Sequence, residues 1–374
     1  MTPLRILLIG DYSNMHSQLA ATLRSMGHKV TVMSEGCGFQ NTERNIDVSR
    51  RQGKLGGAIL AARCKWPLHR HMRGYDIVAL QNPHFLKLRP ARLRYFFDRL
   101  RGENRAVFLT AAGADSLYVH EMLNANSPLR YNEYRIGDSP APLAIANRSA
   151  LDEWLSPELT DFCRYVYDNV DGAVTALYEY HTVCRRYMSE DRFAYGGIPI
   201  DTSALAPFPP AAPDDGVRIF LGRHAERQAE KGTDLLEKAS RIVMERHPGK
   251  CSLEIVENRP YREYIGLMAH SHLVLDQIYS YTPATNALIA MARGRAVVSG
   301  AEPEFYDFIG ERANHPIFNA PTSLDPLVEL LDSAVLNPDD LMRRGADGRE
   351  FVKRHNDARI VANRFLTFWT SKLK

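Results

Sequence analysis

Short apolar runs alternate along the chain with longer stretches in which apolar residues recur every three or four positions. The runs "LRILLIG", "KVTVMS", "YDIVAL", "RAVFLT" and "DGAVTAL" each have the length of one strand and are bounded by polar turns. Between the first two runs, residues 15–26 place Leu19, Leu23 and Met26 on one side of a helix, which Gly27 closes. Short apolar strands that alternate with helices indicate a parallel sheet with both faces covered.

The alternation stops at residues 206–216 and then begins again. The segment "APFPPAAPDD" is rich in proline and has no periodicity, which is typical of a linker. Beyond it, "VRIFLG", "CSLEIVE", "LVLDQ" and "AVVSG" have the composition of strands, and helices are predicted at 233–246, from Tyr261 and from Pro283. The second half of the chain is therefore predicted to form a second doubly wound sheet.

Length and patterning together predict an α/β fold with two domains. A chain of 374 residues is too long for one core. Two doubly wound domains joined by a linker form a cleft, and such sheets bind ligands outside the carboxyl ends of their strands. The predicted parts are a first domain at 1–205, the linker at 206–216, a second domain at 217–354, and a final helix at 355–374 that crosses back to the first domain.

Composition excludes several classes of protein. The apolar run near the start is too short for a signal peptide or a membrane span, and no other stretch approaches eighteen apolar residues. The five cysteines are scattered and never spaced as CxxC, so they read as reduced thiols and not as a zinc site or a disulfide frame. These features predict a cytoplasmic protein that holds no metal.

Positive charge is concentrated between Arg50 and Arg101. This stretch has thirteen Lys or Arg against two acids, although the formal net charge of the chain is only +3. Aromatic and aliphatic residues are interleaved in "KLRPARLRYFFDRLR", so the stretch could hold an anionic membrane surface, a phosphorylated substrate or nucleic acid. A solvated helix face is the alternative. No nucleic-acid-binding module accompanies the stretch, so nucleic acid ranks last, and a peripheral position on the inner face of the plasma membrane is the preferred prediction.

Candidate ligand-binding residues follow the first strand. Gly10 at a strand-to-helix turn would let the backbone approach a ligand, here assigned to the donor, although GxGxxG is absent. Asp11, Ser13 and His16 come next and are predicted to line the acceptor side of the cleft. The alternatives are a turn glycine, helix caps and an ordinary surface histidine.

Two cations follow the first strand of the second domain. Arg223 and Lys231 lie between that strand and the next helix, with Gly232 behind them. Cations in a strand-to-helix loop suit a pyrophosphate, because Arg can bind it bidentately and Lys as a point charge. The alternative is that they are ordinary loop cations, and GxxxxGK[ST] is absent.

The stretch "YSYTPATNALIAMARGR" predicts a helix with an unusually polar beginning. Thr282 is predicted as its N-cap and Pro283 as its first residue. Thr285 and Asn286 would then present backbone N–H groups at the positive end of the helix dipole, which favours phosphate binding. A capped core helix is the alternative reading.

Several motifs resemble one family. "GR…KGTDLLEKA", "YREYIGLMAHSHLVLDQ" and "ALIAMARGRAVVSGAEPEF" resemble the donor domain of GT-B glycosyltransferases of family 4, which are retaining enzymes. "RILLIGDYSNMHSQLAATLRSMGHKVTVMSEG" is similar to their acceptor domain, particularly in transferases from bacterial surface-polysaccharide loci. The resemblance covers most of the chain and is strongest at 221–305. It implies the GT-B fold, in which two Rossmann-like domains face each other across a cleft.

The resemblance also assigns roles to positions. It implies that Arg223 and Lys231 hold the donor diphosphate during catalysis, and that no metal or other cofactor is needed. Four further positions match it: the loop at Glu257 and Asn258, where the nucleobase packs, the acidic position Glu304, and Asp115 in the first domain.

Three positions depart from the pattern. The family's pair of glutamates, with seven residues between them, falls on Tyr281 and Ile289, and a frequent histidine is Ala112. The glutamates normally hold the donor sugar and the donor ribose. Tyr281 is therefore expected to take part in donor binding differently, together with the polar residues that follow it.

The function predicted from the sequence is glycosyl transfer. A sugar would move from a nucleotide-diphosphate donor to a hydroxyl of a glycan or lipid-linked acceptor in surface-polysaccharide assembly, with retention of configuration. One alternative is a non-catalytic nucleotide-sugar binder or scaffold, favoured by Tyr281 and Ile289. A second is a nucleotide-sugar epimerase, which would require carboxylates in the cleft.

Overall fold

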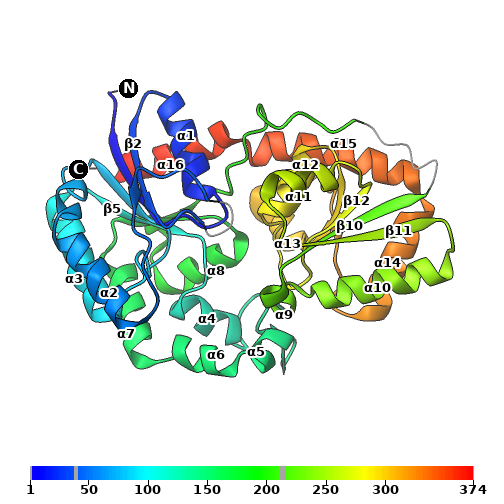
Figure 1. Cartoon of the computed structure of the whole chain (residues 1–374), viewed down its shortest axis with the longest axis horizontal. Helices are drawn as coiled ribbons and strands as arrows, with labels where there is room; N and C mark the ends of the chain where they lie inside the picture. Colours follow the sequence, from blue (N-terminus) through cyan, green and yellow to red (C-terminus); the bar gives the residue numbers. More distant parts are fainter. Residues whose placement is uncertain (1, 38–40, 210–215, 374) are drawn as a thin grey trace. The chain divides into compact units, whose positions relative to one another are not determined.

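Contacts within the chain divide it into two compact units (Figure 1). The structure is a computed structural model, and it describes residues 2–37, 41–209 and 216–373. Unit 1 consists of Met1–Glu121, Ser149–Pro199 and Ala358–Lys374, whereas unit 2 consists of Met122–Arg148 and Ile200–Asp357.

Unit 1 contains a parallel seven-stranded sheet in the order β3-β2-β1-β4-β5-β8-β9. The chain winds outward from β1 to β3 and then in the other direction from β4, so the switch point lies between β1 and β4. The strands β1, β4 and β5 are apolar along nearly their whole length because both faces of the sheet are covered. The strands are β1 (Arg5–Ile9), β2 (Lys29–Ser34), β3 (Ile46–Asp47), β4 (Ile77–Leu80), β5 (Val107–Ala111), β8 (Gly172–Thr175) and β9 (Phe193–Tyr195).

Helices cover both faces of this sheet. In Figure 1, α1 and α16 lie together on one side of the strands and α3 and α7 on the other, in agreement with the contacts within each pair. Trp369 of α16 is fully buried and lies 6.1 Å from Phe108 of β5, measured between ring centroids. The helices are α1 (Met15–Ser25), α2 (Gly53–Lys65), α3 (Pro90–Glu103), α4 (Ser116–Leu123), α6 (Arg148–Trp154), α7 (Pro157–Asn169), α8 (Tyr178–Tyr187) and α16 (Ala358–Lys372), with 3-10 turns at Leu68–His71 and Glu190–Arg192.

Unit 2 contains a parallel five-stranded sheet in the order β11-β10-β12-β13-β14. Its winding direction changes between β10 and β12, so this is its switch point. Ile219, Leu221 and Leu275 of these strands pack with Leu236 and Leu331 in one apolar core. The strands are β10 (Val217–Arg223), β11 (Cys251–Glu257), β12 (Leu273–Leu275), β13 (Ala296–Ser299) and β14 (Phe318–Asn319).

Two pairs of helices cover the sheet of unit 2. The helices α10 and α14 pack together, and α12 packs on α15 (Figure 1). Within the described ranges, no helix combines the length and the apolar content that crossing a bilayer requires. The helices are α9 (Gln228–Lys231), α10 (Thr233–Arg246), α11 (Tyr261–Met268), α12 (Thr285–Ala292), α13 (Pro303–Ile309), α14 (Leu324–Leu336) and α15 (Pro338–His355), with a 3-10 turn at Ala225–Arg227.

The segment Met122–Arg148 belongs to unit 2, although the sequence analysis placed it in the first domain. It contains a two-stranded antiparallel hairpin, β6 (Arg135–Ile136) and β7 (Ser139–Pro140), followed by α5 (Pro142–Ala146). Its backbone and side chains contact residues that follow β12 and β13, which explains why it groups with unit 2. We refer to Met122–Arg148 as the inserted segment.

The doubly wound parallel sheets are confirmed, and two local predictions need adjustment. The predicted final helix at 355–374 corresponds to α16, which begins three residues later, at Ala358, because α15 continues to His355. Residues 210–215 of the predicted linker lie outside the described residues. Its earlier part is fixed to unit 2, because Phe208 N–H donates to the carbonyl of Arg293 at 2.9 Å and the guanidinium groups of Arg293 and Arg295 lie over the Phe208 ring.

Candidate functional site

Lys231 is fixed at the end of α9 by the loop that follows β12. Its Nζ donates to Asp276 Oδ1 at 3.0 Å, and its carbonyl accepts from Ile278 N–H at 3.0 Å. Gly232 follows with φ +67°, and a Cβ added there would lie 2.3 Å from Ile278 Cγ1, so only glycine fits this close approach. The side chain of Lys231 retains 21% of its exposure, and an ammonium has three N–H donors, so it can bind a further acceptor.

Asp276 joins the ends of neighbouring strands through a buried polar network. It directly follows β12, and its Oδ2 accepts from Ser299 Oγ, at the end of β13, at 3.1 Å. Its Oδ1 also accepts from Asn286 Nδ2 at 3.4 Å, and Asn286 Oδ1 accepts from Tyr264 O–H at 2.8 Å. Burial raises the pKa of Tyr264, which keeps its hydroxyl protonated and donating. The network therefore holds Lys231 and Asn286 together at Oδ1 of one buried carboxylate, while Ser299 binds Oδ2.

The polar helix start is displaced from its predicted position. The helix α12 begins at Thr285 with Ala284 as N-cap, so the prediction of Thr282 as N-cap and Pro283 as first residue is wrong. Thr282 is 2% exposed, and its carbonyl accepts from Ser280 Oγ at 2.7 Å, so a local turn competes with the helix there. The amides of the first turn are those of Thr285, Asn286 and the next residue.

Arg223 is neutralised by two carboxylates. It is the last residue of β10, stands opposite Glu257 in the register with β11, and pairs with both Glu257 and Glu237. The hydrogen bond with Glu257 is the main reason why the pKa of Arg223 is raised. Asn258, the residue after Glu257, is exposed and has φ +50° at the turn into α11. A diphosphate at Arg223 would compete with these acids.

The inserted segment brings a further arginine to unit 2. The guanidinium of Arg130 pairs with both Glu302 and Glu304, and it lies 5.3 Å from the ring centroid of Tyr281. The backbone N–H of Arg130 donates to the hydroxyl oxygen of Tyr281 at 2.6 Å, and Tyr131 O–H donates to Glu302 Oε1 at 2.6 Å. Tyr281 is fully buried, so at one of the two positions where glutamate was expected a ring packs against the inserted segment.

The inserted segment also packs against the helix that ends at Lys231. Its α5 contacts α9. Tyr134 has a raised pKa, first because it is buried and then because the charges of Glu133 and Glu230 are near. The segment therefore contacts both α9 and the loop around Tyr281, and the half-buried Ile289 lies farther along α12.

The polar residues after β1 in unit 1 serve the fold. Asp11 accepts from His16 N–H at 3.0 Å and from Ser17 and Thr42 hydroxyls at 2.5 and 2.7 Å. The His16 ring is fully buried, with Nδ1 donating to the Gly10 carbonyl at 2.8 Å and Nε2 accepting from Thr110 O–H at 3.0 Å. Burial lowers the pKa of His16 to about 4. Both side chains are thus occupied within unit 1.

The remaining predicted residues of unit 1 differ in exposure. Gly10 has φ +87°, which favours glycine, and Ser13 is exposed with φ +53°. Asp115 is buried, accepts from Tyr118 N–H at 2.9 Å and Tyr167 O–H at 3.0 Å, and has its pKa raised to about 6 by burial. It does not meet the turn after β1 through any of its hydrogen bonds in the described structure.

The structure thus brings some predicted residues together and separates others. Lys231 and Asn286 share Asp276, Arg223 pairs with Glu257, and Tyr281 and Glu304 share Arg130. Sequence reasoning missed Asp276, Ser299, Tyr264, Arg130 and Glu302. Among the described residues, no group of three or more His, Cys, Asp or Glu side chains has the arrangement of a metal site.

Comparisons with known proteins identify the fold. No family model and no curated protein matches the sequence. A glycosyltransferase from Rickettsia africae aligns over 100% of both chains with a TM-score of 0.60 and 14% identity. A sucrose-phosphate synthase from Thermosynechococcus elongatus aligns over 98% of both chains with a TM-score of 0.63 and 12% identity.

A third structure was determined with a nucleotide sugar. HepE from Anabaena, in complex with UDP-glucose, aligns over 98% of this chain and 100% of its own with a TM-score of 0.62 and 11% identity. At such identities the likeness shows the fold alone. The chain has the GT-B fold.

Proposed function

We propose that this protein is a glycosyltransferase that takes a sugar from a nucleotide-diphosphate donor. The observation that carries the proposal is Lys231, an ammonium held by the buried Asp276 at the carboxyl end of the unit 2 sheet. It stands beside Asn286 in the first turn of α12, where backbone N–H groups and the helix dipole favour an anion. The GT-B likeness to a protein solved with UDP-glucose supports a nucleotide sugar as the ligand.

The chemistry asked of the protein is charge stabilisation and positioning. A diphosphate that leaves carries growing negative charge, and an ammonium placed beforehand stabilises that charge without reorganising. If the departing phosphate oxygen accepts the proton of the acceptor hydroxyl on the same face, no protein nucleophile is needed and configuration is retained. Arg223 would add to this stabilisation by exchanging a carboxylate partner for a phosphate oxygen.

We assign binding of the donor sugar to residues other than the two glutamates of the family pattern. Neither Tyr281 nor Ile289 can accept hydrogen bonds as a glutamate does. Glu304 and Arg130 lie next to Tyr281, and the side chain of Arg130 is 56% exposed although it binds two carboxylates. We assign these two residues to the sugar hydroxyls, with Thr285 and Asn286 nearer the phosphates and Asn258 at the nucleobase.

We also propose where this activity takes place and which acceptor it uses. A cytoplasmic enzyme of surface-polysaccharide assembly would use a glycan or lipid-linked acceptor. Unit 1 is assigned to the acceptor, with the exposed Ser13 as the accessible residue among those predicted there. Asp11, His16 and Asp115 would act by holding the loops in place, because their own polar groups are occupied.

A non-catalytic binder is the second candidate, and one observation favours it. Arg223 is neutralised by Glu237 and Glu257, and the expected glutamates are absent, so a diphosphate could bind without transfer. A nucleotide-sugar epimerase would instead need carboxylates free to carry protons. Glu302 and Glu304 are engaged by Arg130, which does not favour that alternative.

One titration and one turnover assay separate these candidates. Calorimetry with UDP, ADP and GDP should show binding of at least one diphosphate, and the matching nucleotide sugars should be hydrolysed slowly in the absence of acceptor. Binding without turnover, for every sugar tried with candidate acceptors, would favour the binder. Release of an isomerised nucleotide sugar would favour the epimerase, and absence of any diphosphate binding would overturn the proposal.

A further inference from the structure

The outward face of α2 carries large apolar side chains that the fold leaves in solvent. Leu55 is 74% exposed, Ile59 is 49% exposed, and Trp66, which directly follows the helix, is 84% exposed. Leu55 and Ile59 lie within about 40° of each other around the helix, and Trp66 lies just beyond its C-terminal end, where the backbone is extended. We call Leu55, Ile59 and Trp66 the apolar stripe.

The opposite face of the same helix is already used. Leu60, Ala61 and Cys64 are buried against unit 1, and Gly56 approaches the chain so closely that an added Cβ would lie 1.9 Å from the Arg51 carbonyl oxygen. A helix that is apolar on two faces usually buries both. Here the inner face accounts for packing in the described structure, and the apolar stripe needs another explanation.

The stripe is flanked by positive charge that has no carboxylate partner among the described residues, although the guanidinium groups of Arg50 and Arg63 donate to backbone carbonyls. From Arg50 to Gly74 the sequence contains no Asp or Glu. Around a helix, Lys54 and Lys65 fall on one side of the stripe and Arg63 on the other. The seven cations of this region are Arg50, Arg51, Lys54, Arg63, Lys65, Arg70 and Arg73, and in the described part of the chain none forms an ion pair with a carboxylate.

The neighbouring helix α3 extends this surface. Tyr95 is 40% exposed, and Lys65 Nζ lies 4.7 Å from the centroid of its ring. Arg92 and Arg94 of α3 are also exposed. Aliphatic and aromatic side chains at the centre, with cations at the margin, therefore continue from α2 onto α3.

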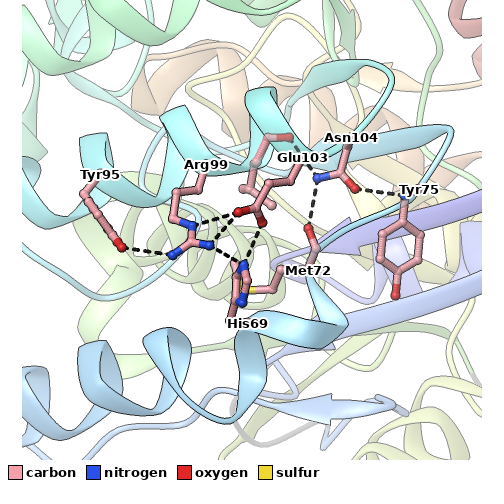
Figure 2. Close-up of polar contacts among 8 residues, drawn as sticks. His69, Met72, Tyr75, Tyr95, Arg99, Glu103 and Asn104 are labelled. Atoms are coloured by element: carbon pink, nitrogen blue, oxygen red, sulfur yellow. Dashed lines mark hydrogen bonds and ion pairs between the residues drawn. The ribbon is translucent and has the colours of Figure 1, made fainter.

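Hydrogen bonds to the C-terminal end of α3 fix the turn that follows Trp66. Figure 2 shows His69 and Arg99 converging on Glu103, with His69 Nε2 2.8 Å from Glu103 Oε2. Asn104 Nδ2 donates to the Met72 carbonyl at 2.9 Å, and Asn104 Oδ1 accepts from Tyr75 N–H at 2.9 Å (Figure 2). These contacts tie the segment after Trp66 to the C-terminal end of α3, so the exposed Trp66 is held in place on unit 1.

We propose that the apolar stripe and its cations dock on the surface of an anionic lipid bilayer. Leu, Ile and Trp side chains enter the boundary between headgroups and acyl chains, while Lys and Arg extend their charges to the lipid phosphates. Each cation near such a surface contributes about 1 kcal/mol, equivalent to about a fivefold gain in partitioning. Charge complementarity selects anionic lipid, and the aliphatic centre of the patch has no counterpart in phosphate-backbone recognition by nucleic-acid-binding proteins. Within the basic stretch 50–101, the proposal therefore assigns membrane binding to one face, which consists of the apolar stripe and its cations.

Vesicle sedimentation of the full chain tests the proposal. We expect binding to vesicles that contain phosphatidylserine, little binding to phosphatidylcholine alone, and weaker binding as salt rises. Equal binding to both vesicles, or none to either at low salt, would overturn it. So would binding to an acidic protein or polynucleotide that excludes vesicle binding and depends on the same residues.

A matched pair of variants distinguishes binding through the apolar stripe from nonspecific hydrophobic adsorption. Leu55→Ser should lower vesicle partitioning about tenfold, whereas Leu336→Ser, the same change at a leucine of unit 2 that is 54% exposed, should leave it unchanged. Lys54→Glu should lower it about tenfold or more, because one charge is lost and an opposite one is added. Equal partitioning of the two serine variants would contradict the proposal. Both leucines are exposed, so melting curves should stay the same and exclude unfolding as the cause.

Trp66 provides an internal signal. Its fluorescence should shift to shorter wavelength on addition of anionic vesicles, because the indole leaves water for the headgroup region. The shift should disappear in Trp66→Phe while binding persists, since the other two tryptophans, Trp154 and Trp369, are not part of the stripe. A shift that survives Trp66→Phe would place the contact elsewhere and overturn the proposed face.

Discussion

The turn after β1 in unit 1 and the loops after β10 and β12 in unit 2 follow corresponding strands of two similar sheets, yet they use polar residues differently. In unit 1, the polar groups of Asp11 and His16 are buried and bonded to their own loop and to β5. In unit 2, a buried carboxylate, Asp276, binds a lysine whose side chain is still partly exposed. The first arrangement fixes a turn, whereas the second presents a charge.

The difference shows how a polar residue after a strand can be interpreted. A side chain with all its hydrogen-bonding capacity satisfied by the protein contributes to the fold, and the fold loses stability when it is removed. A side chain that is anchored by one partner and retains free donors can contribute to a ligand. The predictions below test this contrast, beginning with the largest expected effect.

Lys231→Ala should abolish most turnover and leave the protein folded. Losing a preorganised charge near a leaving diphosphate typically costs about 2–4 kcal/mol of transition-state stabilisation, roughly a thirtyfold to several-hundredfold fall in kcat/KM. Lys238→Ala, on the exposed side of α10, is the matched control and should have no effect. Steady-state kinetics with the active nucleotide sugar measures both, and unchanged kcat/KM in a folded Lys231→Ala protein would remove this lysine from the site.

The contribution of His16 to the stability of unit 1 should fall as pH drops below 6.5. The pKa of His16 is about 4 in the folded state, so between pH 6.5 and 4 the unfolded chain binds the proton that the folded chain refuses. The stability from the neutral ring is complete above pH 6.5 and is lost toward pH 4, up to about 3 kcal/mol.

Tryptophan fluorescence can follow this loss in unit 1 selectively. All three tryptophans, Trp66, Trp154 and Trp369, belong to unit 1. Urea unfolding at pH 7 and pH 5 should show a steeper loss for the natural protein than for His16→Asn, which keeps a donor near the Gly10 carbonyl but does not titrate. Identical pH dependence of the two proteins would mean that His16 is not the responsible group.

Arg130→Ala should weaken unit 2 and donor binding together. Removing the guanidinium leaves Glu302 with fewer partners, and a hydrogen bond to a charged group contributes about 1.5–3 kcal/mol, less where solvent reaches the pair. The donor KM should rise about tenfold if Arg130 also binds the sugar. Arg343→Ala is the control, because Arg343 is exposed and pairs with Asp340 and Asp347 within α15. A loss of stability without any change in KM would limit Arg130 to a structural role.

Asn286→Ala should have the smallest effect. It removes the acceptor of Tyr264 O–H and one donor to Asp276, and it leaves Lys231 paired. We expect donor affinity to fall about fivefold, a change of about 1 kcal/mol. Calorimetric titration checks this, with the exposed Asn337→Ala as control. An affinity loss as large as that of Lys231→Ala would mean that the asparagine, and not the lysine, dominates phosphate binding.

Local sequence was enough to predict most strands of both sheets, whereas the short edge strands β3, β9 and β14 were not recognised. The runs that became β2 (Lys29–Ser34) and β11 (Cys251–Glu257) were recognised at their full length because turns bound them on both sides. The start of α12 was missed because Thr282 and Pro283 have the residue types of an N-cap and a first helical position, and only the turn at Ser280 decides otherwise.

The candidate site was predictable in part. Asp276 could have been found, since it directly follows a predicted strand. Arg130 could not, because 174 residues separate it from Glu304 and no local pattern links them. Nor does sequence reveal that His16 is buried, because its partner Thr110 is 94 residues away.

The interleaved division of the chain also determines the order in which the two units can be completed during synthesis. The inserted segment leaves the ribosome early but acquires its partners, Glu302 and Glu304, only much later. Unit 2 has all its residues once Asp357 has been made, whereas unit 1 still lacks α16 and its buried Trp369. The unit whose synthesis begins first is therefore the last to close its core, and until then its nascent sheet exposes an apolar face that a chaperone would recognise.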